Sequence, residues 1–167
     1  MNRNLYVVMG ITGSGKSTIG IALARALGVD FVEGDDYHPP QNVERMTSGI
    51  PLTDDDRAGW LRALASRIRE AKDNGAGLVL TCSALKRSYR DVLRVSAPEL
   101  QFVFLSGSRA VIADRLEERR GHFMPSSLLD SQLATLEVPG PDERAWACDI
   151  TEPAQKIVDD VVARASA

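Results

Sequence analysis

The chain has 167 residues, 44% of them hydrophobic, and a formal net charge of −3 at pH 7. This length and apolar content are typical of one domain with a full hydrophobic core, so we predict a single domain over residues 1–167. The slight excess of acidic groups argues against broad nucleic-acid binding, which needs concentrated positive charge. Because no apolar stretch approaches membrane-spanning length, we expect no membrane partner.

Strand-like and helix-like segments alternate along the whole sequence. Short apolar runs indicate strands, and apolar residues spaced three or four apart indicate helices. The longest helix is predicted to open at Thr53, an N-cap residue followed by acidic residues, and to stop at the glycines of 74–77. In chain order we expect a strand at 5–9, a helix at 16–27, a strand at 31–33, a helix at 39–46, the long helix, a strand at 78–82, a helix at 86–95, a strand at 102–105, helices at 109–119 and 128–136, a strand at 145–150 and a helix at 153–163.

This alternation predicts an α/β fold of three layers, in which a parallel sheet is covered by helices on both faces. Ligands of such sheets bind beyond the C-terminal ends of the strands. Polar clusters that follow the predicted strands are therefore candidate site residues.

The cysteines and the N-terminus both bear on location. Cys82 and Cys148 lie in apolar, strand-like runs, which favours buried free thiols in a reducing compartment. The first strand begins within a few residues of the N-terminus, which leaves no room for a signal peptide. We therefore expect a cytoplasmic protein.

The run from Gly10 to Ser17 reads G-x-x-x-x-G-K-S, the pattern of a phosphate-binding loop (P-loop), between the first strand and the first helix. Its glycines let backbone N–H groups surround a phosphate, and the following helix adds its positive end. Lys16 can reach the β- and γ-phosphates, and the hydroxyl of Ser17 can hold Mg²⁺. We expect a nucleoside triphosphate to be bound by Gly10, Thr12, Gly13, Ser14, Gly15, Lys16, Ser17 and Thr18.

Acidic residues follow the second strand. A carboxylate there, above all Asp35, would face the γ-phosphate side of the loop and could accept or orient the proton of an acceptor hydroxyl. Because the third strand does not end in an acid, the carboxylate on the magnesium side must come from elsewhere, and Glu33 or Asp35 is the nearest candidate. Two alternatives stay open: Asp35 could cap the following turn, and His38 could be a substrate contact or only a turn residue.

Four cations lie at the remaining candidate positions: Arg45, Arg57, Lys86 and Arg90. An anionic substrate needs such partners, and arginine suits a carboxylate through its bidentate fork. The alternative for each is a solvated surface charge. Lys86 and Arg90 lie one helical turn apart beyond the third strand, which favours them as substrate contacts.

The polar segment 117–127 is predicted to be a lid that excludes water from the reaction. Arg119, Arg120 and His122 fall in it, and arginines on a lid can bring positive charge to the phosphates on closing. The alternative is an exposed basic helix end that is stabilised by the helix dipole.

In addition to the P-loop, the sequence contains several runs that are specific to one family. They are Gly34-Asp35 with His38-Pro39, the run P-L-T-D-D-D-R at 51–57, C-S-A-L-K at 82–86, G-H-F-M at 121–124 and T-L-E at 135–137. Together they resemble the gluconate kinase family, whose members are related in fold to shikimate and nucleoside monophosphate kinases. The resemblance implies transfer of a phosphoryl group from ATP to the 6-hydroxyl of D-gluconate, with Mg²⁺, a five-stranded parallel sheet and often a homodimer.

The resemblance also implies roles for individual residues. Asp35 matches the acid that orients or deprotonates the acceptor hydroxyl, and Arg115 matches a residue that packs on adenine. Lys86 and Arg90 fall in the segment that lines the acceptor, and Arg119, Arg120 and His122 fall in the lid. A kinase for another small acid, such as shikimate, is the nearest alternative. A guanine-nucleotide switch is disfavoured because the sequence has no N-K-x-D motif.

Overall fold

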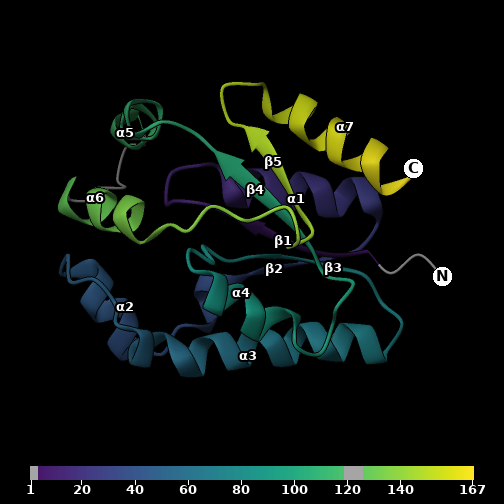
Figure 1. Ribbon diagram of the computed structural model, residues 1–167, viewed down its shortest axis with the longest axis horizontal. Coiled ribbons are helices and arrows are strands. Elements are labelled where there is room, and N and C mark those ends of the chain that lie inside the picture. Colours follow the sequence, from purple (N-terminus) through teal and green to yellow (C-terminus); the bar gives the residue numbers. More distant parts are fainter. Residues whose placement is uncertain (1–3, 119–125) are drawn as a thin grey trace.

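The computed structural model describes residues 4–118 and 126–167. Its sheet has five parallel strands in the order β2-β3-β1-β4-β5 (Figure 1). The strands are β1 (Leu5–Met9), β2 (Asp30–Glu33), β3 (Leu78–Thr81), β4 (Gln101–Ser106) and β5 (Ala145–Asp149). The helices are α1 (Lys16–Leu27), a short 3-10 turn η1 (Gly34–Tyr37), α2 (Pro40–Thr47), α3 (Asp54–Asp73), α4 (Arg87–Arg94), α5 (Arg109–Glu118), α6 (Ser126–Thr135) and α7 (Ala154–Ala165).

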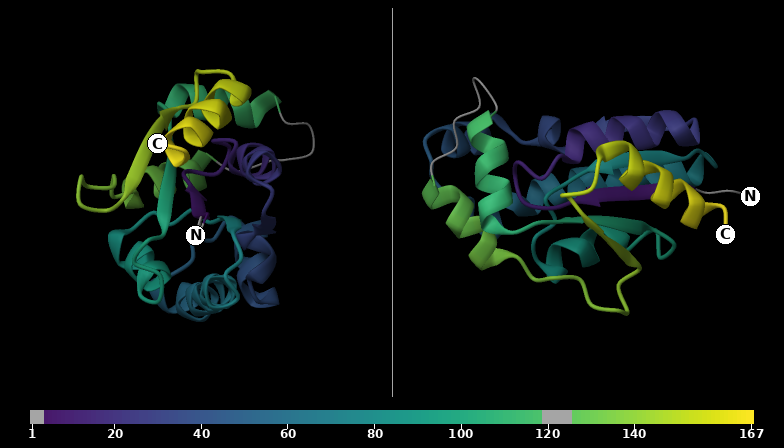
Figure 2. Two further views of the ribbon diagram at one scale, coloured as in Figure 1. Left: turned by 90° about the vertical axis from the view of Figure 1, so that its right-hand side faces the viewer. Right: turned by 90° about the horizontal axis from the view of Figure 1, so that it is seen from above.

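The layers confirm the predicted α/β/α arrangement. Alternate residues of a strand point to opposite faces of the sheet, so β1 contributes to two cores. Leu5 and Val7 lie in a core with α3 and α4, and Tyr6 and Val8 lie in a core with α1 and α7. Figures 1 and 2 show α1 and α7 side by side on one face of the sheet, with α3 and α4 on the other.

The long helix α3 begins directly after Thr53, the predicted N-cap residue. The Thr53 hydroxyl accepts a hydrogen bond from the N–H of Asp56, and the Asp56 carboxylate accepts one from the N–H of Thr53. This reciprocal capping box satisfies two backbone donors that the helix itself leaves unpaired. Asp56 is thereby explained as a cap.

The polar segment predicted at 117–127 is shorter in the structure, because a helix extends into each of its ends. Residues 117 and 118 belong to α5, and α6 begins at residue 126, two positions before the predicted start. The greater part of the predicted lid lies outside the described residues. Figure 1 places α5 and α6 at the end of the sheet to which β4 and β5 point.

The cysteines are both free thiols, as predicted. Cys82 is fully buried, and burial raises the pKa of its thiol to about 12. Cys148 is only partly buried, which corrects the prediction, because β5 is an edge strand of the sheet. Within residues 4–118 and 126–167, no helix combines the length and apolar character needed to cross a membrane.

Candidate active site

The P-loop has the backbone shape that its glycines allow. Gly13 and Gly15 have φ of 90° and 98°, and a Cβ on Gly13 would lie 2.9 Å from Leu116. Ser14 is buried inside the turn, and its Oγ has no hydrogen-bond partner among the described residues. Because this hydroxyl is enclosed by protein, the groups left to bind a phosphate are the backbone N–H groups at the positive end of α1.

Lys16 is the first residue of α1, and its side chain lies back across the loop. Its Nζ donates hydrogen bonds to the carbonyl oxygens of Gly10 at 3.1 Å and Ile11 at 3.3 Å. Because both partners belong to the loop itself, the ammonium group is held close to the place where phosphates would be surrounded. This position suits stabilisation of a transferring phosphoryl group.

Ser17 contacts the carboxylate of Glu33, the last residue of β2. Its hydroxyl donates to Oε2 of Glu33 at 2.5 Å, and the Thr81 hydroxyl donates to Oε1 of Glu33 at 2.6 Å. Mg²⁺ in phosphoryl-transfer sites takes one or two protein oxygens, with phosphate and water supplying the rest. Ser17 and Glu33 form a donor set of that kind, and β2 rather than β3 supplies the acid.

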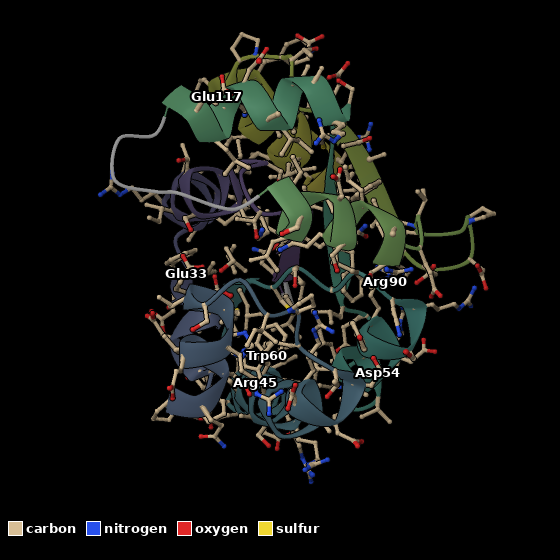
Figure 3. All side chains as sticks on the ribbon, turned by 90° about the vertical axis from the view of Figure 1, so that its left-hand side faces the viewer. Glu33, Arg45, Asp54, Trp60, Arg90 and Glu117 are labelled. Carbon is tan, nitrogen blue, oxygen red and sulfur yellow. The ribbon has the colours of Figure 1, made fainter. Side chains whose placement is uncertain are left out.

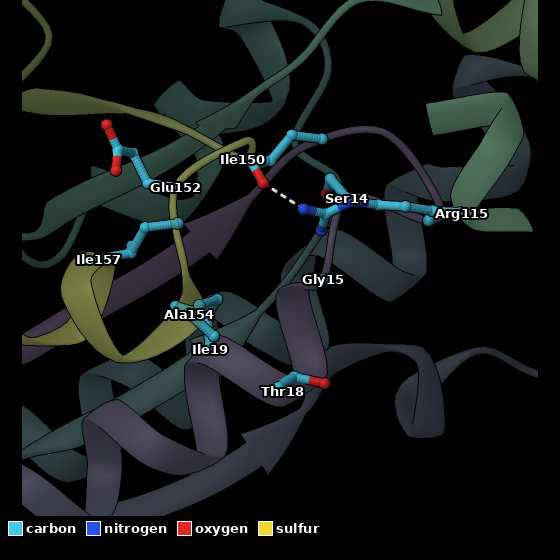
Figure 4. A pocket seen from close by; sticks show the side chains of 10 residues that line it. Ser14, Gly15, Thr18, Ile19, Arg115, Ile150, Glu152, Ala154 and Ile157 are labelled. Carbon is cyan, nitrogen blue, oxygen red and sulfur yellow. Dashed lines mark hydrogen bonds between the residues drawn. The ribbon is translucent and has the colours of Figure 1, made fainter. Parts of the chain in front are cut away.

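A cavity of about 500 Å³ opens beside the P-loop. It is lined by Ser14, Gly15 and Thr18 on one side and by Ile150 and Arg115 on the other (Figure 4). A hydrogen bond from Arg115 to the carbonyl oxygen of Ile150 fixes the guanidinium group there. The size and the mixed lining suit the base and ribose of a nucleotide.

The acid predicted for the acceptor side lies on η1, directly after β2. The side chain of Asp35 is 67% exposed, and its pKa is raised above the ordinary value of 3.8. Partial desolvation by surrounding protein is the main cause; the Glu33 and Asp36 carboxylates add to it, and Lys16 opposes it. The structure thus brings Asp35 to the same edge as the P-loop lysine.

His38 is not a free turn residue. Its ring stacks on Trp60 with centroids 3.9 Å apart, and its Nδ1 lies 3.2 Å from the amide nitrogen of Asn42. Its Nε2 faces Oδ1 of Asp35 at 3.9 Å. Burial, with the nearby Arg57 guanidinium, lowers the pKa of His38 to about 4, so the ring is neutral at neutral pH.

The predicted acceptor cations are paired with acids or carbonyl groups. Lys86 contacts Asp54 at 3.1 Å, and Arg45 contacts Asp56 at 3.4 Å. Arg57 donates to the carbonyl oxygen of Leu52 at 2.7 Å. Figure 3 looks onto this end of the molecule and shows Arg45, Asp54 and Trp60 on the α2–α3 side.

Tyr89 brings two of these cations together. Its hydroxyl accepts a hydrogen bond from Arg57 and donates one to Asp54. Arg57 and Lys86 lie 5.3 Å and 5.6 Å from the centroid of its ring. Two cations on one aromatic ring form a surface that an anionic acceptor could contact.

Arg90 departs from the expectation that it contacts substrate. Its side chain is 0% exposed, and it forms an ion pair with Glu143, which is 1% exposed, at 2.7 Å. A guanidinium group that is enclosed by protein in this way presents no donor to a ligand. The helical spacing contained a hint of this burial, because Arg90 shares the inward face of its helix with Leu93.

Three predicted residues are not placed by the structure, and one residue of the site was missed by the sequence analysis. Arg119, Arg120 and His122 lie outside the described residues. Gln132 of α6 was missed: its amide accepts from the N–H of Thr12 at 2.9 Å and donates to the Thr12 hydroxyl at 3.0 Å. No local sequence pattern points to a contact between residues 120 positions apart.

A P-loop between the central strand β1 and α1, with acids at the end of the edge strand β2, defines a P-loop kinase fold. A family model described as an AAA domain matches residues 5–139. The chain is 58% identical over 137 residues to a gluconokinase of Gluconobacter oxydans (strain 621H), covering 82% of this chain and 77% of that protein. It is 42% identical to the thermoresistant gluconokinase of Escherichia coli (strain K12), with 94% and 90% covered.

A solved structure agrees with these relatives. The crystal structure of a gluconokinase from Sinorhizobium meliloti 1021 superposes with a TM-score of 0.91 at 51% identity, covering 99% of this chain and 93% of that one. The chain therefore belongs to the gluconokinase family.

Proposed function

We propose that this protein transfers the γ-phosphoryl group of ATP to the 6-hydroxyl of D-gluconate, giving 6-phosphogluconate and ADP. The observation that carries the proposal is the identity to gluconokinases along most of the chain. The P-loop, the Ser17–Glu33 pair and the nucleotide-sized cavity supply the parts that such a transfer needs.

The proposed roles on the phosphate side follow from position. Lys16 and the positive end of α1 stabilise charge on the transferring group. Ser17 and Glu33 would hold Mg²⁺, which neutralises phosphate charge when bound. Arg115 lies where the base of the nucleotide is expected.

The proposed roles on the acceptor side differ from those expected of the sequence in one respect. Asp35 orients the acceptor hydroxyl or takes its proton. His38 supports the carboxylate of Asp35. Arg57 and Lys86, which share the ring of Tyr89, are better placed than the buried Arg90 to face the carboxylate of gluconate. The roles of Arg119, Arg120 and His122 in a lid at 117–127 stay predictions, as do a single domain, a homodimer and a cytoplasmic location.

An acceptor panel tests the proposal. ADP release is measured with gluconate, shikimate, glycerate, a nucleoside monophosphate and no acceptor, and phosphorus NMR identifies the product. We expect gluconate to give turnover far above background and a phosphomonoester at its 6-position. The Lys16→Met variant, prepared identically, controls for contaminating kinases. Turnover with another acid, and none above background with gluconate, would refute the assignment.

A further inference from the structure

Residues 82–86, here called the acceptor loop, connect β3 to α4 beside the P-loop. The carbonyl oxygen of Ser83 accepts a hydrogen bond from the N–H of Gly10 at 3.3 Å, and Lys86 is the N-cap residue of α4. Between them, Ala84 has φ of 47°, a left-handed conformation that is unfavourable for a residue with a Cβ. The loop therefore needs contacts from residues outside positions 82–86 to keep this shape.

Arg90 supplies such contacts from inside the protein. Its Nη1 donates to the carbonyl oxygen of Ala84 at 2.8 Å and to that of Leu85 at 3.3 Å. These are the two residues that precede Lys86. The buried guanidinium group thus binds the backbone of the loop at its strained position.

Glu143 holds the guanidinium group in place. Its Oε1 and Oε2 accept from Nε and Nη2 of Arg90 at 2.7 Å and 3.1 Å, and its Oε2 also accepts from the N–H of Gly140 at 2.8 Å. Burial alone would raise the pKa of Glu143, but hydrogen bonds from Arg90, Gly140 and Arg94 outweigh it and keep the pKa at about 2. The pair is therefore ionised at neutral pH.

The T-L-E run that the sequence singled out binds the same loop from another side. The N–H of Glu137 donates to the carbonyl oxygen of Leu85 at 2.7 Å, and its carboxylate accepts from the N–H of Arg87 at 2.8 Å. The second bond satisfies a free donor at the start of α4. The connection from α6 to β5 thus binds the acceptor loop directly through Glu137 and indirectly through Glu143, which binds Arg90.

Stability alone is a weak reason for this arrangement. A buried ion pair is often no more stabilising than apolar residues of similar volume, because both charges lose their hydration. Apolar residues could fill the space but could not bind the carbonyl groups of Ala84 and Leu85. The charged pair, unlike an apolar pair, provides hydrogen bonds to the backbone of the loop at Ala84 and Leu85.

We propose that Arg90 and Glu143 are positioning residues that hold the acceptor loop, and with it Lys86, in the shape that the phosphoryl acceptor requires. The proposal rests on the proposed function for the identity of that acceptor. It replaces direct contact by Arg90 with an action through the backbone of the loop.

The test compares two arginines that share one partner. Arg94 also donates to the Glu143 carboxylate, at 2.8 Å, but the carbonyl oxygens that it binds belong to Arg90 and Glu143 and not to the acceptor loop. We expect Arg90→Met to raise KM for gluconate at least tenfold and to leave KM for ATP, and ATP hydrolysis without acceptor, within twofold. Arg94→Met should leave both KM values within twofold.

A double variant separates positioning from stability. Arg90→Met leaves Glu143 as an unpaired buried charge, whereas Arg90→Met with Glu143→Leu removes both charges and should recover much of the lost thermal stability. We expect its KM for gluconate to stay raised. If Arg90→Met alone fails to fold, KM for gluconate is measured in the double variant instead.

Two results would overturn the proposal. One is a wild-type KM for the acceptor in the double variant, since the pair would then serve stability alone. The other is an equal rise in KM for Arg90→Met and Arg94→Met. The comparison uses whichever acceptor the wild-type enzyme phosphorylates, so this inference and the proposed function fail separately.

Discussion

Replacing Glu33 by glutamine removes one charge from the contact between β2 and the P-loop without changing side-chain size. Glu33 accepts hydrogen bonds from Ser17 at 2.5 Å and Thr81 at 2.6 Å. An ion bound to the Ser17 oxygen would therefore lie close to the carboxylate. Glu33→Gln should weaken Mg²⁺ binding and, without Mg²⁺, strengthen ATP binding, because a negative charge leaves the neighbourhood of the phosphates.

The size of the effect follows from the spacing. A carboxylate and a doubly charged ion roughly 5 Å apart at an effective dielectric constant of about 20 interact by about 7 kcal/mol. Water and the negatively charged phosphate oxygens around the ion cancel most of this, so we expect a net effect of about 1.4 kcal/mol, or about tenfold in a binding constant. We expect the free Mg²⁺ concentration for half-maximal rate to rise about tenfold in Glu33→Gln.

The assay measures the rate against free Mg²⁺ at saturating ATP and gluconate, and a nucleotide titration in EDTA measures ATP affinity without the ion. Asp36→Asn is the matched control, because Asp36 is an exposed carboxylate on the same edge that does not contact Ser17. The reasoning is refuted if the Mg²⁺ dependence of Glu33→Gln equals that of wild type and its ATP affinity in EDTA is not increased. Glu33 would then have only a structural role, as the hydrogen-bond partner of Ser17 and Thr81.

Two further predictions concern the acceptor acid and α6. Asp35→Asn should lower kcat at least 100-fold with ATP binding retained, since a positioned base typically contributes that much; near-normal turnover would make Asp35 a turn residue only. Gln132→Ala removes two hydrogen bonds to Thr12, each worth about 1 kcal/mol, and should raise KM for ATP about 3- to 30-fold without changing KM for gluconate. An unchanged KM for ATP would show that the P-loop keeps its shape without α6.

The parts of the fold that depend on neighbouring residues were predictable. The P-loop, the N-cap at Thr53 and the alternation of strands and helices are each fixed by residues within a few positions of one another. Hydrophobic spacing then predicted a parallel sheet with helices on both faces. Element ends shifted by one or two residues, as at β2, which begins at Asp30.

The parts of the site that depend on distant pairs were not predictable in the same way. Arg90 meets Glu143 across 53 positions, and no property of either neighbourhood specifies the partner. The spacing of Arg90 and Leu93 hinted that Arg90 faces inward, but no sequence pattern indicated that it binds the backbone of the acceptor loop. Glu33 was named as a magnesium-side candidate together with Asp35, and its contact with Ser17 now favours Glu33.

The tautomer of His38 follows from its hydrogen bonds. The Asn42 amide lies 2.8 Å from the carbonyl oxygen of Asp56, which can only accept, so the nitrogen of the amide must face it. The same nitrogen lies 3.2 Å from Nδ1 of His38, so Nδ1 accepts and the ring proton sits on Nε2. His38 therefore presents an N–H toward Asp35 rather than a positive charge.

This tautomer determines how the pH dependence of the reaction should be assigned. The raised pKa of Asp35 predicts that kcat/KM falls, on acidification, at a pH above that of an ordinary aspartate, because the base must be ionised. His38, with a pKa of about 4, takes up a proton in the same acidic range. His38→Gln keeps an N–H donor but cannot titrate, so the acidic limb should persist in this variant. Its disappearance in His38→Gln would assign the limb to the imidazole and remove the evidence for Asp35 as the titrating base.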